Sequence, residues 1–166
     1  MKKITKLNKN IFLKGILNLL LILSFTFNPL KVSAEVAETE INGKLINASS
    51  EFLRDLDFET WQLVAYKSPS IEDKLILRVI GYPGNLRIDH PTGLRVESGR
   101  KQWFLEDQTL LNMELANDGR QAAAEFDLDA LIQNIDKNRP LRLSLPGVFS
   151  DLPVPPFVVK EWRSLN

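Results

Sequence analysis

Apolar and polar positions alternate through two neighbouring segments of the chain, residues 60–67 (TWQLVAYK) and 74–82 (KLILRVIGY). Alternation with a period of two is typical of β-strands, because successive side chains point to opposite faces. A short polar turn, Ser68-Pro69-Ser70, separates the two segments. The pattern therefore predicts an antiparallel hairpin. Apolar residues on both faces of its second strand also predict cover on both sides.

Shorter runs with strand character surround this hairpin. Residues 41–46 indicate a short strand or an extended arm, and residues 47–57 indicate one helical turn or a loop. Turn sequences rich in Gly, Pro, Asn and Asp separate the later runs. The predicted extended segments are residues 86–88, 93–97, 102–105, 110–115 and 141–145.

One segment, residues 127–136, has the spacing of an amphipathic helix. Its apolar residues recur at i, i+3, i+4 and i+7, which places them on one helical face. Asp127 is the expected N-cap, since its carboxylate can accept from free backbone N–H groups. Pro140 prevents continuation of the helix. The apolar stripe consists of Leu128, Leu131, Ile132 and Ile135.

The C-terminal segment, residues 157–165, fits a helix or a strand. Pro156 favours the helix, because proline is well tolerated at the first helical position. Together, many short strands in hairpin order and few helices predict an α+β fold. We expect a mainly antiparallel curved sheet or a small partial barrel, with one clear helix at about 127–136 and a short C-terminal helix.

The first 34 residues have the composition of a secretory signal. They hold six lysines and no acid, and the apolar stretch of residues 16–27 precedes Val32-Ser33-Ala34. This predicts a signal peptide at 1–34, cleaved after Ala34, and a single globular domain at 35–166. The alternative is an uncleaved anchor, but a membrane span needs about 20 apolar residues. We expect export by the general secretion route and no integral span after cleavage.

Removal of this leader changes the charge of the protein. The whole chain of 166 residues has 21 basic and 21 acidic residues, so the loss of six lysines leaves 15 and 21, a net charge of −6. A negative domain is a poor candidate for binding nucleic acid or an anionic membrane. The chain has no cysteine, which excludes disulfides, thiol nucleophiles and cysteine-ligated metals.

The residues that could perform catalysis form no recognisable set. His90, the only histidine, lies in a turn between Asp89 and Pro91. The carboxylate pairs are Glu72-Asp73, Glu106-Asp107 and Asp127 with Asp129. Neighbouring strand residues point to opposite faces, and acids that begin a helix are explained by its dipole. We therefore expect no enzyme activity, no catalytic or metal-ligating residues and no cofactor.

Aromatic and arginine side chains provide candidates for a ligand or partner surface. The aromatics either line a pocket or fill the core, and in a domain of this size the core is favoured. The arginines either form a basic site on the sheet or lie on a solvated strand face. The predicted surface residues are Arg54, Trp61, Arg78, Tyr82, His90 and Trp162.

Six segments, in this order, resemble a cyanobacterial family of secreted proteins known as a domain of unknown function. The resemblance extends from about Ile41 to Trp162. The chain departs from it at Asp57-Phe58-Glu59, where a glycine-containing turn is expected. The segments are 53–55 (LRD), 61–67 (WQLVAYK), 77–84 (LRVIGYPG), 88–90 (IDH), 141–146 (LRLSLP) and 154–162 (VPPFVVKEW).

The resemblance implies a compartment, the thylakoid lumen or the periplasm. It carries over no catalytic residue. The first hypothesis is a non-enzymatic accessory or assembly factor that acts on a photosynthetic membrane complex from the lumenal side. The alternatives are a carrier of a small apolar ligand, such as a pigment or lipid, in a half-open β-barrel, and a carboxylate-dependent hydrolase.

Overall fold

A computed structural model describes residues 36–41, 43–69, 71–81, 88–117 and 122–166. The expected signal peptide, its cleavage site, Tyr82 and most of the extended run at 86–88 lie outside the described residues.

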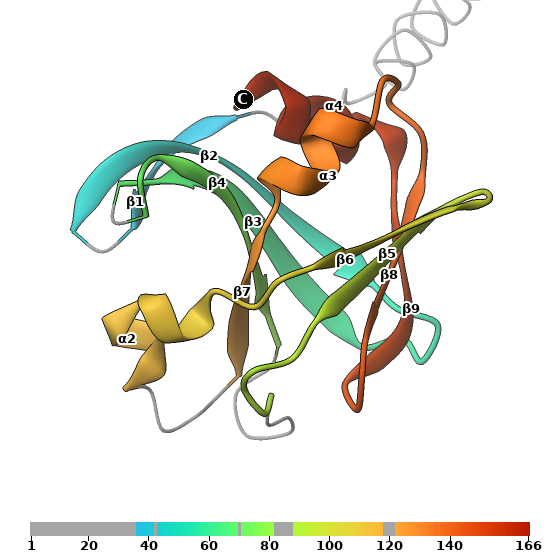
Figure 1. The fold of residues 1–166 in the computed structure, drawn as a ribbon, viewed down its shortest axis with the longest axis horizontal. Coiled ribbons are helices and arrows are strands. Elements are labelled where there is room, and N and C mark those ends of the chain that lie inside the picture. The colour runs from blue at the N-terminus through green and yellow to red at the C-terminus, as the bar shows by residue number, and fades with distance from the viewer. Residues whose placement is uncertain (1–35, 42, 70, 82–87, 118–121) are drawn as a thin grey trace, which may run out of the picture. The chain divides into compact units, whose positions relative to one another are not determined.

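Two antiparallel sheets form the domain (Figure 1). The larger sheet contains β1 (Ala37–Ile41), β2 (Lys44–Arg54), β3 (Thr60–Ser68), β4 (Lys74–Ile80) and β7 (Ala123–Asp127), in that order. The smaller sheet contains, in order, β6 (Lys101–Leu105), β5 (Leu94–Ser98), β8 (Leu141–Leu145) and β9 (Phe149–Val154). Among the described residues, one isolated bridge, between Asp107 and Phe126, connects the two sheets at one edge. No ladder in the described part of the chain closes them into a barrel.

The main core lies between the two sheets. One face of β3 and β4 supplies apolar side chains to it, and the smaller sheet supplies the opposite wall. Trp61 on β3 contacts Phe149 on β9 edge to face, with ring centroids 4.8 Å apart. The other face of the larger sheet holds a second apolar cluster around Val64, Tyr66 and Ile76. Both faces of β4 are therefore covered, as its sequence predicted.

The helices are short: η1 (Thr109–Leu111), α2 (Met113–Ala116), α3 (Asp129–Asn134) and α4 (Pro156–Ser164). Helices α3 and α4 lie at one end of the layer between the sheets (Figure 1) and contribute buried residues to the main core. None of the helices in the described part of the chain is long and apolar enough to cross a membrane.

Several sequence predictions are confirmed. The hairpin of residues 60–67 and 74–82 is β3–β4, and residues 93–97, 102–105 and 141–145 correspond to β5, β6 and β8. The C-terminal segment is a helix with Pro156 as its first residue. The helix expected at 127–136 is present as the shorter α3, but its N-cap is Leu128 rather than the expected Asp127, which ends β7 and accepts from the Asp129 N–H at 3.0 Å.

Other predictions are wrong. Residues 47–57, expected as a helical turn or a loop, lie mostly in the long strand β2. Residues 110–115, expected as a strand, fold into η1 and α2, because the Asn112 side chain accepts from the N–H groups of Glu114 and Leu115. Strands β7 and β9 lie in segments where no strand was expected. The antiparallel sheets of the predicted α+β fold are thus correct, but the domain is predominantly β.

Candidate interaction surface

Buried Asp55 organises the turn between β2 and β3. Its Oδ1 accepts from the backbone N–H groups of Asp57 and Glu59, each at 2.9 Å. Its Oδ2 accepts from Nε1 of Trp61 at 2.8 Å, and Trp61 lies in the main core. The backbone N–H of Asp55 also donates to the carbonyl of Glu59 at 3.1 Å. One carboxylate thus fixes the shape of the turn and connects it to the core.

The turn holds Phe58 in an unfavourable backbone conformation. Its φ angle is 65°, in the left-handed region that glycine adopts without cost. For another residue this conformation costs roughly 1–2 kcal/mol. It occurs within the three residues where the sequence lacks the expected glycine. The structure therefore shows that Phe58 itself takes the glycine-like conformation.

The side chain of Phe58 gains little burial in return, since it is 80% exposed. Leu56, two residues earlier, is 62% exposed. We call residues 56–59 the hairpin tip. Asp57 and Glu59 are exposed there as well, and exposed Arg54 ends β2 beside it. The hairpin tip therefore presents exposed apolar side chains on a hydrogen-bonded turn, with the charges of Asp57, Glu59 and Arg54 beside them.

A cluster of polar and charged side chains lies on the face of the larger sheet that points away from the main core. Glu125 on β7 is buried and accepts from Nε of Arg78 at 2.7 Å and from Nδ2 of Asn112 at 3.2 Å. The Tyr66 hydroxyl also donates to this carboxylate. Burial, and then the Glu125 charge, raise the pKa of Tyr66, so the phenol stays neutral and remains a donor.

His90 belongs to the same region through a chain of hydrogen bonds. Its Nδ1 lies 2.7 Å from Oδ2 of Asp107, and this oxygen also accepts from the Thr92 N–H. The Thr109 hydroxyl and N–H donate to the other Asp107 oxygen, and the same hydroxyl accepts from the N–H of Glu125. Burial acts to raise the pKa of Asp107, but these hydrogen bonds outweigh it and lower the pKa. The Asp107 carboxylate is therefore ionised near neutral pH.

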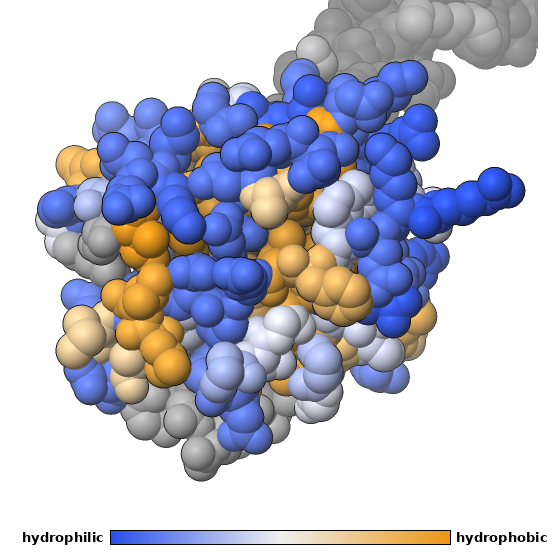
Figure 2. Space-filling view, in the orientation of Figure 1, coloured by the Kyte–Doolittle hydropathy of each residue, from blue (hydrophilic) through white to orange (hydrophobic). Residues whose placement is uncertain are grey.

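These bonds hold η1 and α2 against the sheet. Asn112 joins the two helices, caps α2 and donates to both oxygens of Glu125. The outward face of the helices exposes Leu110, Leu111 and Met113. Figure 2 shows an apolar patch on the face that carries α2. This α2 patch, defined by the three residues, is a second candidate for contact with a partner.

Of the six surface residues predicted from the sequence, the structure describes five and places them in different parts of the domain. Arg54 and Trp61 belong to the turn that carries the hairpin tip, whereas Arg78 and His90 belong to the polar cluster on the opposite face. Trp162 is fully buried on α4, and its Nε1 has no hydrogen-bond partner among the described residues. Tyr82 lies outside the described residues. Sequence reasoning missed Asp55, Leu56 and Phe58, although the departure from the family resemblance at Asp57-Phe58-Glu59 was a signal.

The acids of the three carboxylate pairs named in the sequence analysis have different structural roles. Asp107 and Asp127 accept hydrogen bonds within the fold, while Glu72 has φ 48° in the β3–β4 turn. Within the described ranges, no group of three or more His, Asp or Glu side chains could hold a metal ion.

Two other acids influence each other where α4 crosses β2. The buried Ser49 hydroxyl donates to Oε2 of Glu161 at 2.7 Å. Burial, and then the charge of Glu161, raise the pKa of Glu51. The ionised form of Glu51 is therefore less favourable in the folded protein than in the unfolded chain.

This raised pKa predicts that Glu51→Gln is more stable than the parent protein at neutral pH. A raised carboxyl pKa gives stability that is present below the unfolded-state pKa and lost as the pH rises through the folded-state pKa. Because Glu51 is partly exposed, we expect a gain of only about 0.3 kcal/mol. Urea unfolding should show this gain near pH 7 and none near pH 3.5. Glu38→Gln, on exposed β1, controls for the lost charge, and an equal gain there would contradict the explanation.

Comparison with known proteins gives one result that covers the domain. The family described as "Protein of unknown function (DUF3122)" matches residues 34–165. Searches of curated proteins and of solved structures found no match. The expected relation to a domain of unknown function is thereby confirmed. The chain belongs to the DUF3122 family.

Proposed function

We propose that the protein is a non-enzymatic accessory or assembly factor that docks on a membrane protein complex through the hairpin tip. The resemblance described above implies export to the thylakoid lumen or the periplasm and a photosynthetic complex as the partner. The observation that carries the proposal is Phe58, which is both strained and exposed. Neither backbone preference nor packing within the domain explains a phenylalanine there.

A rigid apolar projection is well suited to binding. Aromatic side chains that enter a partner's pocket supply much of the energy of an interface. Asp55 holds the turn with three hydrogen bonds to its carboxylate, so little conformational entropy remains to be lost on docking. The hairpin tip is therefore organised before its partner arrives.

Charge defines the chemistry of the partner. The exposed acids Asp57 and Glu59 border Phe58, and Arg54 provides one nearby positive charge. The complementary surface is an apolar cleft with basic side chains at its rim. The same acids disfavour insertion into an anionic bilayer, so we assign the hairpin tip to a protein surface.

The polar cluster and the core give the alternatives less support. A carboxylate-dependent hydrolase needs a carboxyl group that holds a proton near neutral pH, but within the polar cluster the pKa of Asp107 is lowered and Glu125 is paired with Arg78. A carrier of an apolar ligand needs aromatic side chains along a pocket. Trp61 and Trp162 instead lie in the core, and Trp103 lines a cavity together with cations rather than with other aromatic side chains.

Phe58→Gly is expected to abolish recovery of the partner complex without harming the fold. Glycine relieves the left-handed strain but makes the unfolded chain more flexible, so we expect the free energy of unfolding to rise by about 0.5 kcal/mol. The full chain, tagged and expressed in its own host, would be purified from solubilised membranes and its co-purifying subunits quantified. Urea unfolding of the same protein measures the stability.

Two variants serve as controls. Phe104→Ser removes another exposed phenylalanine, on β6, and should leave recovery unchanged. Leu111→Ser tests the α2 patch in the same way. Loss of the complex with Leu111→Ser but not with Phe58→Gly would refute docking through the hairpin tip. Recovery from the periplasmic fraction alone, with no photosynthetic subunit, would refute the proposed function.

A further inference from the structure

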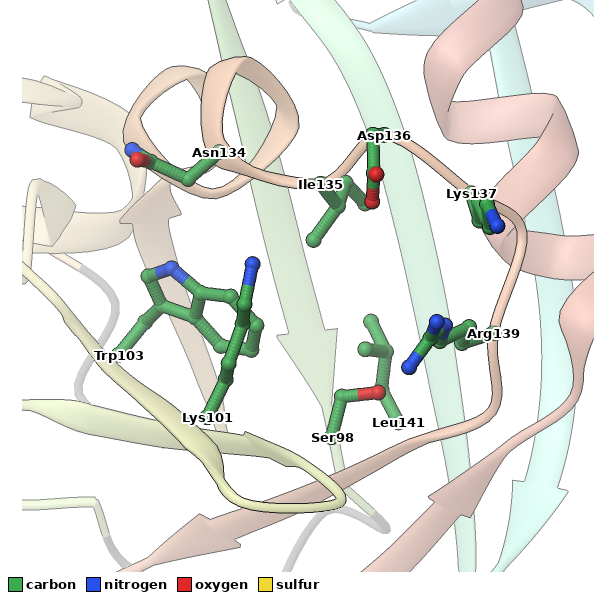
Figure 3. Close-up of a pocket in the computed structure, with 9 residues that line it drawn as sticks. All are labelled: Ser98, Lys101, Trp103, Asn134, Ile135, Asp136, Lys137, Arg139 and Leu141. Carbon is green, nitrogen blue, oxygen red and sulfur yellow. The ribbon is translucent and has the colours of Figure 1, made fainter.

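A small cavity lies between the β5–β6 hairpin and the connection from α3 to β8 (Figure 3). Its volume is about 110 Å³. For comparison, an engineered apolar cavity of about 150 Å³ binds benzene. The space therefore suits one ring or a small branched group.

The walls of the cavity combine an aromatic surface with aliphatic side chains. In Figure 3 the Trp103 indole forms one side, and Ile135 points in from the α3–β8 connection. Both side chains are partly buried and pack against the main core, whereas Leu141 is fully buried. Trp103 is therefore held in place while part of its indole remains accessible. A planar group is the natural neighbour for such a surface.

Positive charge gathers around this aromatic wall. Lys101, Lys137 and Arg139 line the cavity, with Asp136 as the one acid. In Figure 3 the Arg139 side chain lies across the cavity from Trp103. All three cations are exposed, and none of them forms an ion pair with another described residue. Positive charge is therefore concentrated around this cavity, although residues 35–166 have a net charge of −6.

We propose that this cavity binds a small organic anion with a planar ring, of the aromatic carboxylate class. The ring would lie against Trp103, and the carboxylate would face Arg139, whose planar guanidinium can donate two parallel hydrogen bonds. Lys101 and Lys137 add attraction for the negative charge. Asp136 disfavours a second negative group on the same ligand. The site is separate from the hairpin tip and does not depend on the docking proposal.

Titration of the isotope-labelled full-length protein with benzoate tests the site. The three tryptophans give three indole N–H signals by NMR, and Trp103 is the partly exposed one, because Trp61 and Trp162 are buried. Trp103→Phe assigns its signal. We expect benzoate to shift that signal saturably, with the other two indole signals unmoved. Neutral benzyl alcohol, of similar size, should bind at least about tenfold more weakly.

Variants that remove one charge each show whether the carboxylate of benzoate contributes to binding or whether contact of the ring with Trp103 is sufficient. Arg139→Gln should weaken benzoate binding at least about tenfold, since a charge-assisted hydrogen bond is lost. Arg95→Gln, an exposed arginine on β5 that does not line the cavity, should leave the affinity within about twofold. Lys101→Gln replaces the first variant if Arg139→Gln disturbs the spectrum. The proposal is wrong if no saturable shift occurs below about 20 mM benzoate, or if neutralising the cavity cations leaves the affinity unchanged.

Discussion

Glu125→Leu is expected to lower the free energy of unfolding by about 3–5 kcal/mol, the range typical when one partner of a buried ion pair is removed. The substitution leaves the Arg78 guanidinium, whose side chain is 15% exposed, without its carboxylate. It also removes the acceptor for the Tyr66 hydroxyl and for the Asn112 amide. Urea unfolding followed by circular dichroism measures the change.

Two further variants show whether the unpaired charge causes the loss. Glu125→Gln keeps an acceptor oxygen and should cost less than Glu125→Leu. The double variant Glu125→Leu with Arg78→Met removes both charges and should recover a large part of the stability. If the double variant is no more stable than Glu125→Leu, the unpaired charge of Arg78 is not the cause.

This cluster shows where sequence reasoning reached its limit. Arg78 interrupts an apolar strand and was visible from the sequence as a charge where burial is expected, whereas Glu125 lies in β7, where no strand was expected. Their pairing depends on β7 lying beside β4, and 47 residues separate them in the chain. No local sequence pattern indicates that β4 and β7 pair.

The prediction for residues 47–57, which lie mostly in strand β2, was wrong for a related reason. The mixture of serines and apolar residues in this segment, Ser49, Ser50, Phe52 and Leu53, suggested one helical turn or a loop. In the structure, Ser49 donates to Glu161, 112 residues further along the chain, and helix α4 thereby covers the strand. By contrast, β3 and β4 were predictable from their apolar alternation, and α4 was favoured by Pro156, because proline is well tolerated at the first helical position. Elements were thus predictable where local patterns determine burial, and they were missed where their polar groups bind partners that are distant in the chain.

The hairpin tip lies between these two cases. The departure from the family resemblance at Asp57-Phe58-Glu59, where a glycine-containing turn was expected, indicated an unusual turn. The sequence did not indicate that the Asp55 carboxylate would accept both from the N–H groups of the turn and from the indole N–H of Trp61. The geometry explains how the turn tolerates Phe58 and leads to a second large expected effect.

Asp55→Ala is expected to lower the free energy of unfolding by about 2–3 kcal/mol, because its carboxylate accepts three hydrogen bonds and the indole N–H of Trp61 would stay buried without a partner. Asp55→Asn keeps one acceptor oxygen and should lose about half as much. Since the same bonds hold Phe58 in place, both variants should also weaken recovery of the partner complex, in the same order. Urea unfolding and quantified co-purification provide the two measurements. A stable Asp55→Ala protein that still recovers its partner fully would show that the turn does not need this carboxylate, and rigidity of the hairpin tip would then no longer support docking.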